Sequence, residues 1–279
     1  MIPNEKFVAR LKDIIEETHD YNLHAHSQFC DGRDPISAIA AAAFDAGMKF
    51  FAFTPHSPIN VASTCNMDKS RMCEYLAEMD RMREEYSGRM ELLTSLEIDG
   101  MGTEFGPHID YFQRLPLDFR LGSVHFVPNQ EGVYLDCDGR FERFQRQLKE
   151  CYRGDLRYVV EKYFEQVLVM MERGGFELLG HFDKIAGNAT MADPEIENRG
   201  WYEALVDDVI SHAQSSGLVV EINTKAFADK GRFFPDERWW GKLIDANLPL
   251  AIDSDAHYAS KVAAGRKEAF MRLDKFKRS

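Results

Sequence analysis

Short apolar segments alternate with longer amphipathic ones about seven times along the 279-residue chain, and this alternation restricts the possible folds more than any other feature. We predict strands in the apolar segments, at residues 21–26, 50–56, 92–99, 120–126, 178–183, 218–223 and 250–254. Several are nearly continuous apolar runs, which is typical of strands covered on both faces. Strands that alternate with helices indicate parallel pairing with right-handed crossovers. The pattern favours an α/β fold, a (β/α) barrel with one repeat fewer than the usual eight, and an open doubly wound sheet is the alternative.

The amphipathic segments carry recognisable helix ends. Asp34 followed by Pro35 predicts an N-cap and a proline in the first helical turn. Asp68 and Asp155 are further candidate N-caps, and the helix after Asp155 should end at Gly174. These signals separate the predicted strands by helices, as a βα repeat requires.

The chain contains no Pro/Ser-rich linker, so we expect residues 1–279 to form a single domain. Residues 1–19 would be a helical lead-in, and residues 20–260 would be the barrel core. The longest apolar run, residues 38–44, is too short to span a bilayer. The first residues show no signal-peptide pattern, and we therefore expect a cytoplasmic protein that does not bind membranes.

Charge and cysteine content narrow the function classes. The formal net charge is −12, and we find no basic stripe interleaved with aromatic residues, so we expect no nucleic-acid partner. There is no Gly-x-Gly-x-x-Gly or Walker-type loop, which argues against a nucleotide-binding fold. The five cysteines form no C-x-x-C pair, and we expect reduced thiols.

Six of the nine histidines fall at the ends of predicted strands, namely His24, His26, His56, His125, His181 and His257. Glu97 and Asp255 lie at strand ends as well. The carboxyl ends of parallel barrel strands meet on one face, so these side chains should converge there. Each fragment alone is a weak signal, but six such positions on one face are hard to assign to chance. We interpret the other three as structural, namely His19, His108 and His212.

The residue types point to metal binding. Residues i and i+2 of a strand share a face, so His24 and His26 can bind one ion, and Asp255 and His257 have the same spacing. Imidazole and carboxylate ligands without thiolate suit Zn²⁺, Mn²⁺ or Fe²⁺. The number of candidate ligands exceeds what one tetrahedral ion can use, so we predict two or three divalent metal ions, with Glu97 as a bridge.

Several motifs resemble those of the polymerase-and-histidinol-phosphatase (PHP) superfamily. In order, these are "HAH…D", "TPH", "LEID", "GSVHF", "GHFDK" and "DSDAH". The segments "LGSVHFV", "YFEQV" with "LLGHFDKIA", and "VVEINTKAF" are similar to the histidinol-phosphatase branch over about residues 20–260. Two positions depart from that branch: Gly32 stands where many relatives have histidine, and Lys225-Ala226-Phe227 replaces the usual Gly-Leu.

The resemblance implies a distorted (β/α)7 TIM-like barrel with a trinuclear metal site. Carried over by motif, the first metal would be held by His24, His26, Glu97 and Asp255. Glu97 would bridge to a second metal held by His125 and His181. The third metal would be held by Asp31, His56 and His257. Of these, we expect Glu97, Asp255 and His257 to act directly in catalysis.

We therefore predict a metal-dependent phosphomonoesterase that acts through a metal-activated hydroxide and hydrolyses L-histidinol phosphate. Four cations near strand ends are candidates for binding the small phosphorylated substrate, namely Arg33, Lys184, Lys225 and Arg232. Three acids are candidates for orienting the histidines, namely Asp99, Asp183 and Asp253. One alternative is a PHP phosphoesterase for nucleotides, oligonucleotide ends or another small ester. A non-catalytic metal-binding module is the other. The sequence leaves the oligomeric state open.

Overall fold

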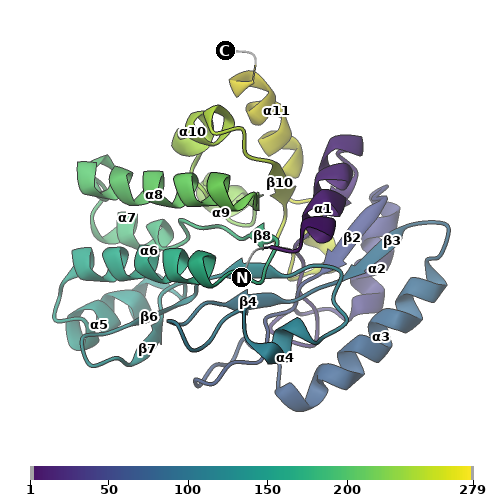
Figure 1. The fold of residues 1–279 in the computed structure, drawn as a ribbon, viewed down its shortest axis with the longest axis horizontal. Coiled ribbons are helices and arrows are strands. Elements are labelled where there is room, and N and C mark those ends of the chain that lie inside the picture. The colour runs from purple at the N-terminus through teal and green to yellow at the C-terminus, as the bar shows by residue number, and fades with distance from the viewer. Residues whose placement is uncertain (1–2, 278–279) are drawn as a thin grey trace.

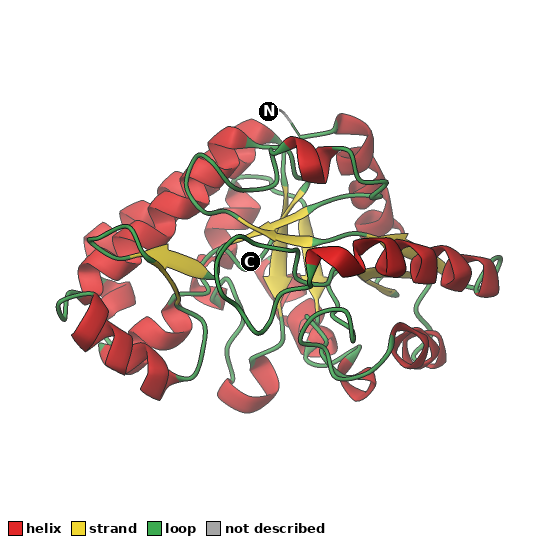
Figure 2. Ribbon diagram, turned by 90° about the horizontal axis from the view of Figure 1, so that it is seen from below, coloured by secondary structure: helices red, strands yellow, loops and turns green. Residues whose placement is uncertain are grey.

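The computed structural model describes residues 3–277, and it places short strands at the centre of the molecule with helices around them (Figures 1 and 2). The strands are β1 (Tyr21–Asn22), β2 (Phe50–Phe53), β3 (Glu91–Thr94), β4 (Glu97–Asp99), β5 (Leu121–Ser123), β6 (Phe126–Pro128), β7 (Tyr134–Asp136), β8 (Leu178–Leu179), β9 (Val219–Asn223) and β10 (Leu250–Asp253). The α/β architecture with parallel strands is therefore confirmed.

The helices are α1 (Glu5–Glu17), α2 (Ile36–Asp45), α3 (Met72–Glu85), α4 (Asp110–Gln113), α5 (Phe141–Cys151), α6 (Leu156–Arg173), α7 (Ala186–Ala192), α8 (Gly200–Ser216), α9 (Phe227–Lys230), α10 (Trp240–Asp245) and α11 (Arg266–Phe276). Four 3₁₀ turns accompany them in residues 3–277: η1 (Lys69–Arg71), η2 (Ile196–Asn198), η3 (Glu237–Trp239) and η4 (Ala259–Lys261). Helices α6 and α8 lie side by side (Figure 1). Within the described chain, no helix combines the length and apolarity needed to cross a bilayer.

The strands form two parallel sheets, in the orders β1-β2-β3 and β10-β9-β8-β5-β4. Strands β3 and β4 together correspond to the predicted strand at 92–99, which changes partner in its middle from β2 to β5. Isolated parallel bridges connect the two sheets at His56–Glu97 and at Ala25–Ala256. The predicted strands therefore follow one another in sequence order around the centre, although the ladder of hydrogen bonds is not continuous.

The strands are shorter than predicted because side chains replace backbone carbonyls as acceptors near their carboxyl ends. Asp253 Oδ1 accepts from Leu23 N at 2.5 Å, where the predicted strand at 21–26 was expected to continue. Asn22 Oδ1 accepts from Ser254 N at 2.7 Å. The ladder stops where polar side chains begin, and the loops that follow carry the candidate ligands.

An apolar cluster gathers inward-facing side chains from strands of both sheets, among them Tyr21, Phe50, Ala52, Leu93, Leu121, Leu178, Val219 and Ala251. Helix α1 adds Val8, Leu11 and Ile14 to this cluster. Their spacing of three residues places them on one face of the helix. The lead-in helix thereby closes the amino-terminal end of the strands with apolar side chains.

Two predicted caps are confirmed, and one is wrong. Asp155 accepts from Tyr158 N at 2.9 Å, and Asp68 accepts from Ser70 N at 2.8 Å. Asp34 does not cap α2, because its carboxylate accepts from Ala259 N. The hairpin of β6 and β7 was not predicted, because both strands have only three residues and those of β7 are only partly buried.

Candidate metal centre

Side-chain alternation along the strands explains how the candidate ligands reach one place. Starting from the apolar cluster, every second residue of a strand points inward. Ala52 of β2 and Leu121 of β5 belong to this cluster, and the inward position four residues after each is His56 or His125. Asp255 likewise lies four residues after Ala251 of β10. The interior thus changes from apolar at one end to imidazole and carboxylate at the other.

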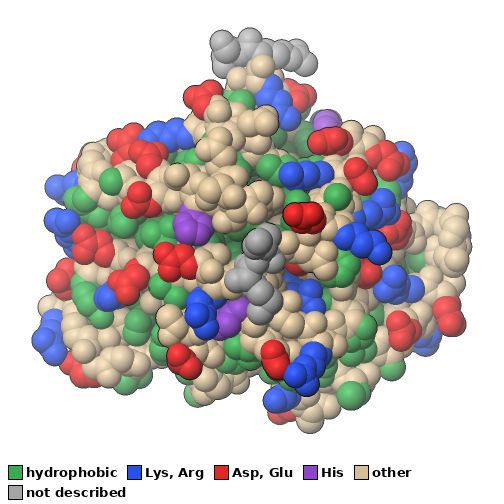
Figure 3. Space-filling view, viewed as in Figure 1, with side chains coloured by type: hydrophobic (Ala, Val, Ile, Leu, Met, Phe, Trp, Pro, Cys, Tyr) green, Lys and Arg blue, Asp and Glu red, His purple; other side chains and the backbone are tan. Residues whose placement is uncertain are grey.

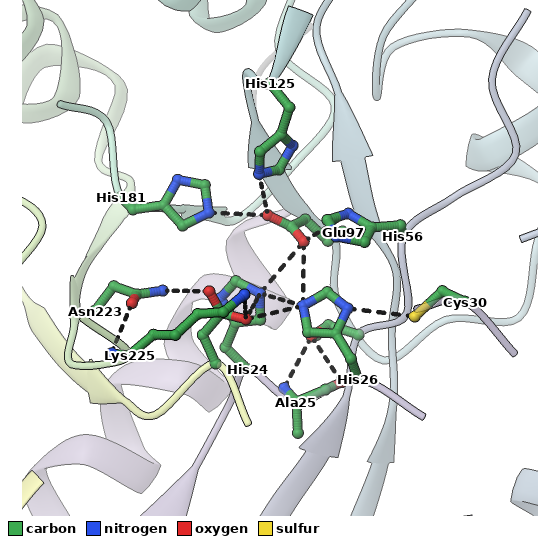
Figure 4. Close-up of polar contacts among 12 residues, drawn as sticks. His24, Ala25, His26, Cys30, His56, Glu97, His125, His181, Asn223 and Lys225 are labelled. Atoms are coloured by element: carbon green, nitrogen blue, oxygen red, sulfur yellow. Dashed lines mark hydrogen bonds and ion pairs between the residues drawn. The ribbon is translucent and has the colours of Figure 1, made fainter. Parts of the chain in front are cut away.

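Glu97 lies at the centre of the polar group, and imidazoles from several loops point toward it (Figure 4). Its Oε2 has three ring nitrogens around it: His56 Nδ1 at 3.0 Å, His24 Nε2 at 3.4 Å and His26 Nε2 at 3.4 Å. Its Oε1 faces His181 Nε2 at 3.0 Å and His125 Nε2 at 3.5 Å. A single buried carboxylate therefore faces five imidazoles.

Asp255 and Asp31 extend the cluster on the side of His26. The Nε2 atoms of His24 and His26 are 3.1 Å apart, and Asp255 Oδ1 lies 3.1 Å from His26 Nε2. Asp31 Oδ1 lies 3.2 Å from His257 Nε2 and 3.8 Å from His56 Nε2. All nine residues predicted as metal ligands are thus brought into one continuous group.

A surrounding layer of acceptors fixes the orientation of several rings. Glu221 Oε1 lies 2.6 Å from His24 Nδ1, and Asp99 Oδ1 lies 2.9 Å from His125 Nδ1. A proton on each Nδ1 satisfies these contacts and leaves the Nε2 lone pair facing the cluster. Cys30 Sγ lies 3.3 Å from His26 Nδ1. Such outer contacts are typical of histidines that ligate a metal.

Of the three acids predicted to orient the histidines, only Asp99 does so in the structure. Asp253 accepts from the backbone of Leu23, and Asp183 accepts from the backbone of Asp236 at 2.9 Å. Asp183 also faces the guanidinium of Arg232 at 3.5 Å. Sequence position identifies acids at strand ends, but it does not reveal whether a backbone amide or a ring lies nearest.

The charges of the cluster shift the pKa values of its members strongly. Burial acts to raise the pKa of Glu97, but the surrounding imidazoles, first His56 and His24, hold it well below its ordinary value. Burial acts to lower the pKa of His24, and the charges of Glu221, Asp255 and Glu97 outweigh burial and raise it. Mutual stabilisation of this kind joins carboxylates and imidazoles into one electrostatic unit.

Buried polar atoms without partners test whether metal ions fit the group. Glu97 Oε2, Asp31 Oδ1 and His181 Nδ1 make no hydrogen bond, although such atoms are nearly always paired in folded proteins. Four sets of side chains bring their ligand atoms within 4.8 Å of one another: His24, His26 and Glu97; His26, Asp31, His56 and His257; His56, Glu97 and His125; and His24, His181 and Glu221. This nitrogen and oxygen donor set fits divalent ions.

These four sets overlap with the three predicted by motif but do not reproduce them. Four residues each belong to two sets, namely His24, His26, His56 and Glu97. Asp255 belongs to none of the four, yet it lies within 3.8 Å of His24 and closer to His26. The division of the ligands among individual ions remains a prediction.

A cleft of about 220 Å³ opens beside the cluster and is lined in part by Asp31, His56, His125, Lys225 and Asp255. Lys225 Nζ lies 3.3 Å from Asp255 Oδ1 and 3.2 Å from His257 Nε2. Lys184 is buried, and its Nζ lies 4.0 Å from Asp255 Oδ2. Two of the four cations predicted to bind phosphate therefore lie at the cluster.

The other two cations are placed differently. Arg33 has an exposed side chain, and its backbone amide donates to His257 O. Arg232 donates to both carboxylate oxygens of Glu197, at 2.6 and 3.0 Å. Because Arg232 is paired with Glu197, its guanidinium does not line the cleft.

Glu221 and Asn223 of β9 were not predicted as site residues. Glu221 contacts His24 and also accepts from His181 N at 2.9 Å, and Asn223 Nδ2 donates to Asp255 Oδ2 at 3.1 Å. Both residues are fully buried. A glutamate inside an otherwise apolar strand is rarely buried without a partner, and this signal was present in the sequence.

Together, the parallel strands and the cluster of imidazoles and carboxylates at their carboxyl ends define an α/β protein with a candidate multinuclear metal centre. Residues 22–225, more than half of the chain, match the PHP domain family, and the chain belongs to this family. The resemblance drawn from the motifs is thereby confirmed.

Curated relatives share about a quarter of their residues with this chain. A histidinol-phosphatase of Bacillus subtilis is 24% identical over 271 residues, which cover 89% of this chain and 97% of that protein. A histidinol-phosphatase of Lactococcus lactis is 25% identical over 254 residues, with coverage of 87% and 85%. The similarity therefore extends over nearly the full length of these relatives.

Solved structures share the fold. A protein of Listeria monocytogenes, proposed to be a histidinol phosphatase, superposes with a TM-score of 0.79 at 17% identity, covering 89% of this chain and 99% of the other. The histidinol phosphate phosphatase of Lactococcus lactis, solved with zinc, L-histidinol and phosphate, gives a TM-score of 0.66 at 19% identity, with coverage of 92% and 94%.

Proposed function

We propose that this protein is a metal-dependent phosphomonoesterase that hydrolyses L-histidinol phosphate to L-histidinol and phosphate. The observation that carries the proposal is Glu97, a buried carboxylate that faces five imidazoles and has an unpaired oxygen. The names of the curated relatives and the bound molecules of the Lactococcus lactis structure support histidinol phosphate as the substrate.

The nine clustered residues would hold two or three divalent ions, with zinc, manganese or iron suited to these donors. Bound ions of this kind polarise phosphoryl oxygens and make a coordinated water acidic enough to react near neutral pH. We assign Glu97 to the bridging position, because both of its oxygens face ring nitrogens. Asp255 lines the cleft and His257 Nδ1 lies 3.3 Å from its Oδ1, and we assign both residues a direct role in catalysis.

The protein's own groups would prepare the phosphate for attack. Lys184 and Lys225 place two ammonium groups beside Asp255, where they can bind phosphoryl oxygens. Asp99 and Glu221 hold the rings of His125 and His24, so that little reorganisation is needed when the substrate binds. Positioning and charge stabilisation of this type account for most of the catalysis of phosphoryl transfer.

On the face shown in Figure 3, Lys and Arg side chains lie interspersed with Asp and Glu. The formal net charge of −12 supports a small-molecule substrate rather than a nucleic acid, which would bind to a continuous basic surface. The cytoplasmic location and the organisation of residues 1–279 as one domain stay predictions.

A panel of phosphate esters tests the proposed function. Purified protein loaded with Zn²⁺ or Mn²⁺ would be assayed with histidinol phosphate, nucleoside monophosphates, sugar phosphates and a short oligonucleotide. We expect the highest kcat/KM for histidinol phosphate. A higher kcat/KM for a nucleotide or the oligonucleotide would contradict the proposed substrate and favour the alternative phosphoesterase activity. The absence of any turnover would favour a metal-binding module.

A further inference from the structure

Cations and carboxylates together line the cleft beside the metal centre and the cavity that adjoins it. Lys184 and Lys225 lie next to Asp255, and the cleft is also lined by Asp136, the last residue of β7, and by Asp138. Asp138 also lines an adjoining cavity of about 270 Å³, so its carboxylate lies where the two spaces meet. A carboxylate in this place repels a phosphate dianion, and its presence calls for an explanation.

The backbone around Asp138 is held from both sides. Asn188 Nδ2 donates to the carbonyl of Cys137 and to that of Gly139, each at 2.9 Å. Asp136 Oδ1 accepts from Asp138 N at 2.9 Å and from Gly139 N at 3.2 Å. The main chain is thus fixed, while the Asp138 side chain remains about one third exposed.

The ion pair of Asp138 with Lys184 is long enough to be replaced by a pair with another cation. Its Oδ2 lies 3.6 Å from Nζ of Lys184, which is too long for a hydrogen bond of good geometry. Burial acts to lower the pKa of Lys184, but Asp138 and Asp255 raise it to about 12, so this ammonium stays charged. A phosphate bound at the cluster would compete for Lys184, and Asp138 would then be free to pair with another cation.

Asp138 is the better placed of these two carboxylates, Asp136 and Asp138. Asp136 is occupied by the turn that it caps and by Arg143 Nη1 at 3.0 Å. Asp138 has a longer contact, at 3.6 Å from Lys184 Nζ, and its side chain is partly exposed, so it can also contact a cation bound in the cleft.

We propose that Asp138 determines substrate specificity by binding the ammonium group of an amino-alcohol phosphate, next to the phosphate that Lys184 would bind. The inference rests on the proposed function and adds the group that binds the amine. The phosphate dianion would lie at Lys184 and Lys225, and the ammonium group, two carbon atoms from the ester oxygen, would lie beside it at Asp138.

The test compares Asp138→Asn with the wild type on three substrates: histidinol phosphate, the same ester without its amino group, and p-nitrophenyl phosphate. We expect kcat/KM for histidinol phosphate to fall about 10- to 100-fold, the range for losing a hydrogen bond to a charged group. The values for the two substrates without an amine should change by less than about threefold. Asp229→Asn removes an exposed carboxylate of the adjoining cavity and is the matched control, with all three values unchanged.

An equal loss on all three substrates would overturn the proposal, because it would indicate a general effect on the centre. A loss on both alkyl esters with p-nitrophenyl phosphate spared would also overturn it, because that pattern identifies a proton donor to the leaving group. Asp138→Glu, which keeps the charge, should recover part of the preference for the amine. If the wild type itself shows no activity on histidinol phosphate but cleaves the other two, the proposed function fails, whatever the variants do.

Discussion

Buried glutamates at the two ends of the strands have opposite surroundings. Glu177, just before β8, accepts from Arg120 N at 2.8 Å and from Asn4 N at 3.2 Å, so both carboxylate oxygens are paired with backbone amides. Glu97 is equally buried, yet its Oε2 is unpaired and three ring nitrogens crowd it. A satisfied buried carboxylate indicates a structural role, and an unsatisfied one surrounded by imidazoles is suited to binding a cation.

The largest expected effect follows from Glu97→Gln. The substitution keeps the shape of the side chain and removes the charge that we assign to the bridging position. We expect kcat/KM to fall by about 10³-fold or more, because metal-ion catalysis contributes several kcal/mol. Circular dichroism should remain that of the wild type. Turnover that survives the change would contradict the bridging role.

We expect a second, smaller effect, on metal affinity, when Asp99 no longer orients the ring of His125. Asp99→Asn removes the carboxylate 2.9 Å from His125 Nδ1. Loss of such an outer contact typically weakens metal binding by about 10- to 100-fold. Competition with a chelator of known affinity measures the change, and an unaltered affinity would remove Asp99 from the account.

At the amino-terminal end of the strands, we expect Glu177→Gln to lower stability without changing metal content or activity. The amide nitrogen of glutamine would face a backbone N–H, so one hydrogen bond is lost. We expect the free energy of unfolding to fall by about 1–3 kcal/mol. Metal content and kcat/KM of the folded protein should match the wild type; if metal content fell instead, the contrast between the two glutamates would be wrong.

The smallest effect concerns pH in the metal-free protein. Burial acts to lower the pKa of His125, but the charges of Asp99 and Glu97 raise it to about 10. A raised histidine pKa stabilises the fold fully below the unfolded value of 6.5, and this stabilisation is lost as pH rises toward 10. In the presence of chelator, wild-type stability should fall relative to Asp99→Asn by up to about 1.4 kcal/mol per pH unit. Parallel curves for the two proteins would contradict this assignment.

The sequence predicts the repeat of strands and helices and eight of the nine predicted ligands, because periodicity and strand-end position are local signals. Asp31 was predicted only from the resemblance of its motif to the family. It does not predict the break between β3 and β4, since the change of partner at Ser95 and Leu96 depends on tertiary contacts. The ion pair of Arg232 with Glu197 depends in the same way on residues distant in sequence. Glu221 could have been found, because a charged residue within a buried strand requires a partner.

The metal content of purified protein tests the central claim most directly. Wild type and Glu97→Gln, loaded with excess Zn²⁺ or Mn²⁺ and then desalted, would be compared by elemental analysis. We predict two or three ions per wild-type chain and at least one fewer in the variant. Less than one ion per wild-type chain would contradict the account.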